Sequence, residues 1–204
     1  MSEELTATVL VCTLRPSPAQ SSSELLASQL IDELAKHNVT GKLYRIVDYN
    51  VKFGVEKDMG NGDNWPQIRE AIVQSDILII ATPIWMGQPS SVSKVVMERL
   101  DAEISETDDA GRPSMYGKVA NVAIVGNEDG AHHTSAELYQ VLTDVGFTIP
   151  AGGPTYWTGE AMGSVDYKDL KETPVKTALT TRLAAANTAH LARLLKRDQY
   201  PVTQ

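Results

Sequence analysis

Apolar runs of strand length alternate with helical patterns along most of the chain, and this alternation limits the possible folds more than any other feature. The strongest run is DILIIAT at residues 76–82, and residues 6–14 and 119–125 have the same continuous apolar character. Such runs are typical of parallel strands that are buried on both faces. We predict a further strand over residues 42–48 and a fifth that begins at residues 147–149.

Helical periodicity occupies the intervals between these strands. Apolar residues recur at spacings of three and four over residues 24–37, 91–104 and 134–145, and Pro66 suits the first turn of a short helix over 66–74. A long last helix is predicted over about 174–196, with Leu179, Leu183, Leu191 and Leu194. Strands that alternate with helices form a parallel sheet covered on both faces. We therefore predict a single doubly wound α/β domain over residues 1–204.

Composition and charge exclude several classes of protein. The net charge of −8 over 204 residues argues against nucleic-acid binding, which needs basic patches. No apolar run approaches the roughly 18 residues of a membrane span, and Glu3 and Glu4 stand where a signal peptide would be basic. Cys12 is the single cysteine, so neither a disulfide within the chain nor a cysteine-rich metal site is expected. We expect a cytoplasmic protein without nucleic-acid or membrane partners.

The loop between the first strand and the first helix combines hydroxyl groups with one cation. A helix N-terminus with such groups suits a phosphate. The loop contains no glycine, so it matches neither a dinucleotide fingerprint nor a P-loop. A monophosphate such as that of FMN fits better, although capping serines and ordinary loop polarity are the alternative explanation. The candidate phosphate-binding residues are Thr13, Arg15, Ser17, Ser21, Ser22 and Ser23.

The loop after the third strand has the residues expected around a planar ring. Trp85 and Met86 supply an apolar wall, and Gly87 allows the backbone to approach a flat ligand closely. Aromatic residues and methionine are also enriched in subunit interfaces, so a cap on the core or an interface remains an equal alternative. The candidate ring-binding residues here are Pro83, Ile84, Trp85, Met86 and Gly87.

The loop after the fourth strand carries two glycines and several polar residues. Its glycines suit backbone contacts to a heteroaromatic ring, and its carboxylates next to His132 and His133 raise a metal site as an alternative. Adjacent side chains on one segment point in different directions, so we expect no metal. The candidate residues are Gly126, Asn127, Glu128, Asp129 and Gly130. No nucleophile motif of the G-x-S-x-G type is present, which leaves the chemistry to a cofactor.

These segments resemble the flavodoxin-like superfamily, and within it the branch of NAD(P)H-dependent FMN reductases and quinone reductases. The residues Thr13 to Arg15 with Ser21 to Ser23 are similar to that branch's phosphate loop. Thr82-Pro-Ile-Trp85 is similar to its T-P-x-Y flavin loop. The resemblance covers about residues 6–157, and Lys94 with the pair Glu98-Arg99 matches a pattern on the next helix. The departures are Cys12 for a glycine, Pro16 and Pro18 in the phosphate loop, and Trp85 for the commoner tyrosine.

The resemblance implies a five-stranded flavodoxin-like sheet of order 2-1-3-4-5 that binds FMN. It further implies an enzyme that passes electrons from NADPH or NADH through FMN to a small-molecule acceptor, such as a quinone or a flavin. A homodimer or homotetramer is expected, and no side chain is assigned as a general acid or base. Two alternatives stay open. One is a flavodoxin-type electron carrier without NAD(P)H turnover, and the other is a fold relative that has lost its flavin.

Overall fold

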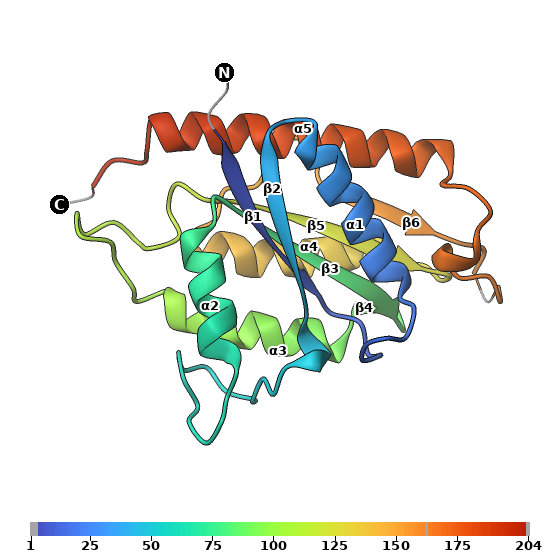
Figure 1. The fold of residues 1–204 in the computed structure, drawn as a ribbon, viewed down its shortest axis with the longest axis horizontal. Coiled ribbons are helices and arrows are strands. Elements are labelled where there is room, and N and C mark those ends of the chain that lie inside the picture. Colours follow the sequence, from blue (N-terminus) through green and yellow to red (C-terminus); the bar gives the residue numbers. More distant parts are fainter. Residues whose placement is uncertain (1–3, 162, 203–204) are drawn as a thin grey trace.

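A parallel sheet of order β2-β1-β3-β5-β6 forms the centre of the molecule (Figure 1). The computed structural model describes residues 4–161 and 163–202. The strands are β1 (Leu5–Val11), β2 (Val39–Arg45), β3 (Ile77–Trp85), β5 (Val119–Gly126) and β6 (Thr155–Thr158), and the two-residue β4 (Gln88–Pro89) pairs antiparallel with β3. Counted along the chain without β4, this is the order 2-1-3-4-5, so the predicted doubly wound fold is confirmed.

Helices cover both faces of this sheet (Figure 1). The bounds are α1 (Ser22–Ala35) and α5 (Val175–Arg197) on one face, and α2 (Trp65–Gln74), α3 (Ser91–Leu100) and α4 (Ala131–Val145) on the other. Strand β3 shows why its sequence is continuously apolar. Ile79 packs into the core under α1 and α5, whereas Ile80 packs into the core under α2, α3 and α4. Within the described residues, no helix is both long and apolar enough to cross a membrane.

Helix α5 packs against the rest of the molecule mainly through small side chains, together with the partly buried Leu191 and Leu195. Its leucines at 179 and 183 are 56% and 48% exposed, so they do not supply the packed face. Alanine and threonine allow a helix to approach its neighbours closely because they project little beyond the backbone. The buried residues of α5 are Thr177, Thr181, Ala184, Ala185, Thr188, Ala189 and Ala192.

Two strands lie elsewhere than predicted. The fifth strand is β6, and of residues 147–149 only Thr148 joins the sheet, through an isolated bridge to Val119. Pro150 has no amide to continue that pairing, and Gly152 and Gly153 turn the chain before β6 begins. The second strand begins earlier, at Val39, and ends at Arg45, so that residues 46–48 form a short 3-10 turn, η1 (Ile46–Asp48).

A buried arginine organises the long loop before α2. Arg99 of α3 donates hydrogen bonds to the carbonyl oxygens of Lys52 (3.0 Å) and Glu56 (2.7 Å). It also forms an ion pair of 2.7 Å with Asp63, and neither side chain of this pair has exposed surface. The guanidinium lies 5.5 Å from the ring centre of Trp65, so charge, hydrogen bonds and stacking all hold the loop to α3.

Candidate functional site

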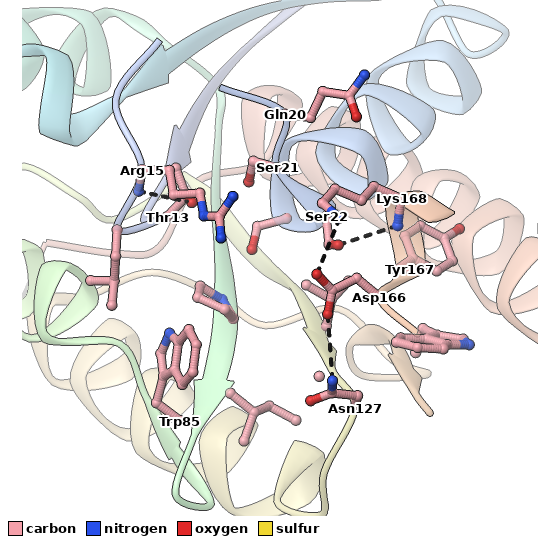
Figure 2. Close-up of a pocket in the computed structure, with 17 residues that line it drawn as sticks. Thr13, Arg15, Gln20, Ser21, Ser22, Trp85, Asn127, Asp166, Tyr167 and Lys168 are labelled. Atoms are coloured by element: carbon pink, nitrogen blue, oxygen red, sulfur yellow. Dashed lines mark hydrogen bonds and ion pairs between the residues drawn. The ribbon is translucent and has the colours of Figure 1, made fainter. Parts of the chain in front are cut away.

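A cavity of about 160 Å³ opens at the carboxyl ends of the strands. Its position is that of ligand sites in doubly wound sheets, which lie outside the carboxyl ends of the strands. Figure 2 shows side chains from several loops that converge on it. The lining residues are Thr13, Leu14, Arg15, Gln20, Ser21, Ser22, Ser23, Pro83, Ile84, Trp85, Val125, Gly126, Asn127, Trp157, Asp166, Tyr167 and Lys168.

One end of the cavity is built by the N-terminus of α1. Ser21 caps this helix, because its hydroxyl accepts a hydrogen bond from the amide of Glu24. Within the described chain, the amides of Ser22 and Ser23 have no backbone acceptor. The guanidinium of Arg15 extends into the cavity beside them and forms no ion pair with any described residue (Figure 2). Unpaired amides, the helix dipole and a free cation together suit an anion.

Ser17 lies outside this group of residues. Its amide and its hydroxyl donate hydrogen bonds of 2.8 Å and 2.6 Å to the carboxylate of Asp48. These two bonds lower the pKa of Asp48. Of the six hydroxyl and cationic residues predicted in this loop, Ser17 alone does not line the cavity, so the structure supplies no phosphate role for it.

The expected loop after the third strand is in fact a tight β-hairpin. Strand β3 continues to Trp85, and β4 returns from Gln88. Met86 and Gly87 join them with φ angles of 53° and 75°, as the central residues of a type I′ turn require. A type I′ turn twists in the same sense as the strands that it joins, so β3 stays regular up to the turn. Trp85 therefore faces the cavity from the end of a strand rather than from a loop. Pro83 and Ile84 line the cavity with it, whereas Met86 is 91% exposed at the tip.

The loop after β5 divides between the cavity and this hairpin. Gly126 and Asn127 line the cavity. The carboxylate of Glu128 instead accepts hydrogen bonds from the amides of Met86 and Gly87, so it supports the hairpin. The other two predicted residues, Asp129 and Gly130, do not line the cavity either: Asp129 is exposed, and Gly130 lies against the backbone of Gly87.

A wall of the cavity that the sequence did not indicate comes from the segment after β6. Lys168 donates its amide to the hydroxyl of Ser22 (3.2 Å), and its ammonium pairs with Asp166 and Asp169. The hydrogen bond to Asp169 raises the pKa of Lys168. The Asn127 amide donates to Asp166 at 3.4 Å (Figure 2). These residues were missed because the fifth strand was predicted too early, which placed this segment away from the strand ends.

Two aromatic residues complete this wall. Trp157 of β6 and Tyr167 have ring centres 5.5 Å apart. Burial raises the pKa of Tyr167, and its hydroxyl donates a 2.6 Å hydrogen bond to Gln29. The Tyr167 hydroxyl is therefore engaged within the fold and has a structural role. Trp157, which follows the segment predicted to begin the fifth strand, is the signal in the sequence that could have indicated this wall.

A buried hydroxyl network adjoins the cavity-lining residues Thr13 and Pro83. The Ser90 hydroxyl donates to the carbonyl oxygen of Cys12 (2.6 Å), and the Ser93 hydroxyl donates to the hydroxyl oxygen of Thr82 (2.7 Å). These bonds tie the ends of β1 and β3 to the start of α3, which Ser90 caps. Cys12 follows β1 rather than lying within it, and burial raises the pKa of its thiol to about 12. A neutral, buried thiol is a poor nucleophile.

The histidines of the third loop have separate partners. His133 contacts Glu137 (2.6 Å) and Gln88 (3.0 Å), while the ring of His132 meets Tyr156 edge to face. Across residues 4–161 and 163–202, no group of three or more His, Cys, Asp or Glu side chains is arranged to hold a metal ion.

Comparisons with known proteins connect this geometry to flavin chemistry. The 8-demethyl-8-aminoriboflavin-5'-phosphate synthase of Streptomyces davaonensis is 32% identical over 206 residues, which cover 96% of this chain and 80% of that protein. A crystal structure of RosB with the bound intermediate 8-demethyl-8-formylriboflavin-5'-phosphate has a TM-score of 0.87 and 31% identity, covering 96% of this chain and 82% of the other.

A protein named divalent metal cation transporter MntH from Mycobacterium bovis is also 32% identical over 199 residues. These cover 94% of this chain but 29% of that protein, so the chain corresponds to less than a third of its length. The family model described as NADPH-dependent FMN reductase matches residues 6–163. With its flavodoxin-like fold and its cavity at the strand ends, the chain belongs to the NADPH-dependent FMN reductase family.

Proposed function

We propose that this protein binds FMN and passes electrons from NADPH or NADH through it to a small-molecule acceptor, such as a quinone or a flavin. Family membership supports a flavin-binding protein of the oxidoreductase type. One observation carries the proposal further: a single cavity combines an anion-binding end at α1 with an aromatic end at Trp85. A flavin mononucleotide has these two parts, a phosphate and a planar ring system.

The described residues divide the binding of FMN between the two ends. Arg15 and the open amides of Ser22 and Ser23 would hold the phosphate, and Pro83 and Trp85 would contact the ring. Bound FMN would supply the hydride and electron transfer, while the protein orients it and supplies the surrounding charges. Trp85 is 54% exposed and the cavity is open, which leaves room for a second reactant to approach.

The test is a flavin and turnover assay on the purified protein. We expect bound or added FMN to give a visible flavin spectrum, and NADPH or NADH to be oxidised catalytically with a quinone or free flavin present. Arg15→Ala should weaken FMN binding by about 10-fold or more, because a charge-assisted contact to phosphate is lost. The exposed Arg197 at the end of α5 provides the control, since Arg197→Ala removes the same charge outside the cavity lining.

Other outcomes would point to other functions. A flavin spectrum without NAD(P)H oxidation would favour an electron carrier. A protein that takes up no FMN would overturn the proposal, and would leave a fold relative without flavin.

A second candidate is an enzyme for which the flavin phosphate is the substrate. The relative that is 32% identical over 96% of this chain favours it, because that relative's name describes a flavin phosphate with an amino group at position 8. To separate the two candidates, FMN is incubated with the protein in air with ammonium and amino acids, and the flavin is analysed by mass spectrometry. An unchanged flavin mass together with NAD(P)H oxidation supports the first candidate. A changed flavin mass without NAD(P)H oxidation supports the second candidate.

A further inference from the structure

The loop that carries Arg15 has little internal support. Within residues 13–20, the amide of Ala19 donates to the carbonyl of Pro16, and the amide of Arg15 has a long contact of 3.4 Å to the hydroxyl of Thr13. Pro16 and Pro18 have no amide hydrogen to donate. The conformation of this loop therefore depends on contacts from outside it.

Arg45, the last residue of β2, supplies the main contacts. One nitrogen of its guanidinium donates hydrogen bonds to the carbonyl oxygens of Arg15 (3.3 Å) and Ala19 (2.8 Å), near the two ends of the loop. Another nitrogen forms an ion pair with Glu24 in the first turn of α1. Arg45 is only 6% exposed and does not line the cavity. A planar guanidinium with several fixed donors suits this bridging position.

Asp48 holds the middle of the same loop from the same side. Three residues beyond Arg45, its carboxylate accepts the amide and hydroxyl hydrogen bonds of Ser17. Sheet register explains how both anchors reach the loop. Arg45 pairs with Val11, the last residue of β1, so that the end of β2 lies beside the point where the loop begins.

We propose that Arg45 is a positioning residue for the phosphate end of the flavin site. It does not touch the ligand; it fixes the backbone of Arg15 and joins that backbone to the start of α1, so that the Arg15 guanidinium and the open amides of α1 face one point. The proposal rests on the proposed FMN binding. It predicts that Arg45 contributes to the affinity for FMN but not to the affinity for riboflavin, which lacks the phosphate.

The experiment compares dissociation constants for FMN and riboflavin, measured by flavin fluorescence, in the wild type and in variants. Arg45→Met keeps much of the apolar stem and removes every donor. We expect it to raise the FMN constant by about 10-fold or more, and to change the riboflavin constant by less than about 2-fold. The matched control is Arg193→Met, because Arg193 also donates to backbone carbonyls, those of Ala189 and His37, and does not line the cavity.

Two further variants separate positioning from simple charge attraction. Asp48→Ala removes a negative charge, so charge attraction alone predicts that FMN binds more tightly. Loss of the anchor for the loop predicts the opposite, a dissociation constant for FMN that is about 3-fold higher. Asp48 is exposed, and this variant should fold even if Arg45→Met does not. Arg45→Lys keeps the positive charge but lacks the planar guanidinium with its several donors. We expect it to restore only part of the FMN affinity that Arg45→Met loses.

The outcomes distinguish this inference from the proposed function. Full recovery in Arg45→Lys, tighter FMN binding in Asp48→Ala, or equal losses for FMN and riboflavin in Arg45→Met would each overturn the positioning role. A wild type that binds FMN no better than riboflavin would overturn the phosphate site itself. A wild type that prefers FMN, with the same preference in Arg45→Met and Asp48→Ala, would overturn the inference and leave the proposed function intact.

Discussion

The carboxylate of Glu128 accepts a 3.0 Å hydrogen bond from the amide of Gly87, although 41 positions separate the two residues in the chain. Its other oxygen accepts the amide of Met86 at 3.2 Å. One side chain from the loop after β5 therefore holds the tip of the hairpin that carries Trp85. The two loops that the sequence indicated separately for the flavin ring form one connected structure.

Removing this carboxylate is expected to loosen the hairpin. Glu128→Ala leaves two turn amides without their acceptor, so Trp85 loses its fixed position and the dissociation constant for FMN should rise by about 3- to 30-fold. Glu128→Gln keeps one acceptor oxygen and should have a smaller effect. Fluorescence titration with FMN measures both, with Asp129→Ala as a control because Asp129 is the exposed neighbour. Unchanged binding in Glu128→Ala would refute the supporting role.

Gly130 permits the close approach of these two loops. A Cβ atom at this position would lie 2.7 Å from the Cα atom of Gly87, and its φ of +121° disfavours any other residue. We expect Gly130→Ala to lower the free energy of unfolding by about 1–3 kcal/mol, measured by urea denaturation. Gly60→Ala is the comparison, since Gly60 also has a positive φ but open space around it. Equal losses in the two variants would mean that the backbone contact is unimportant.

The buried Asp63 predicts how stability changes in acid. Burial alone would raise the pKa of Asp63, but hydrogen bonds from the amides of Met59, Trp65 and Lys52 and from Arg99 outweigh it and lower the pKa to about 2 from 3.8. A lowered pKa in the folded state stabilises the protein above the unfolded value, and this contribution is lost as the pH falls from about 4 towards 2.

The test is the urea midpoint of the wild type and of Asp63→Asn between pH 7 and pH 2. The variant should be less stable at pH 7 by about 3–5 kcal/mol, because Arg99 is left buried without its ion pair. Its stability should also fall less steeply in acid, since residue 63 no longer titrates. Parallel curves for the two proteins would contradict the assignment to Asp63.

Cys12 should be unreactive in the folded protein. Its burial raises the pKa of the thiol to about 12, so very little thiolate is present at pH 8. Iodoacetamide at pH 8 is expected to leave the native protein unmodified and to add one carbamidomethyl group after unfolding in urea. Mass spectrometry measures the difference, and rapid modification of the native protein would show that the site opens.

The outer face of α5 is the surface on which we propose that a homodimer or homotetramer forms. Val175, Leu179 and Leu183 follow one another at intervals of four residues and are 83%, 56% and 48% exposed. Leu179→Lys combined with Leu183→Lys should therefore reduce the mass measured by light scattering to that of one chain, without unfolding. Lys176→Glu is the control on the same helix, and an oligomer that survives the double substitution lies on another surface.

Local sequence determined a large part of this fold. Residues 76–82 are apolar on both faces, which only a central strand between two helical layers accommodates, and the structure extends that strand to Trp85. The regular spacing of Leu138, Leu142 and Val145 likewise predicted α4, which the structure begins a turn earlier at Ala131. Such patterns can be interpreted from the sequence because each depends on residues that are close along the chain.

Part of the candidate site could also be predicted from the sequence. Thr13, Arg15 and Ser22 line the cavity as expected, because a loop that joins a central strand to a helix necessarily lies at the strand ends. Lys168 and Trp157 were not expected there. Their position depends on where β6 begins, and Pro150 and two glycines displace it beyond the predicted point.

Tertiary structure alone decided which polar groups meet. Ser17 and Asp48 are 31 positions apart and Arg15 and Arg45 are 30 apart, and they meet only because β2 lies parallel to β1 with Val11 beside Arg45. No local period encodes such a register; it follows from the simultaneous packing of both strands. Local sequence patterns were enough to predict a doubly wound sheet with a polar loop at its strand ends. The three-dimensional packing decided that Arg45 and Asp48 hold that loop and that Glu128 supports the hairpin instead of lining the cavity.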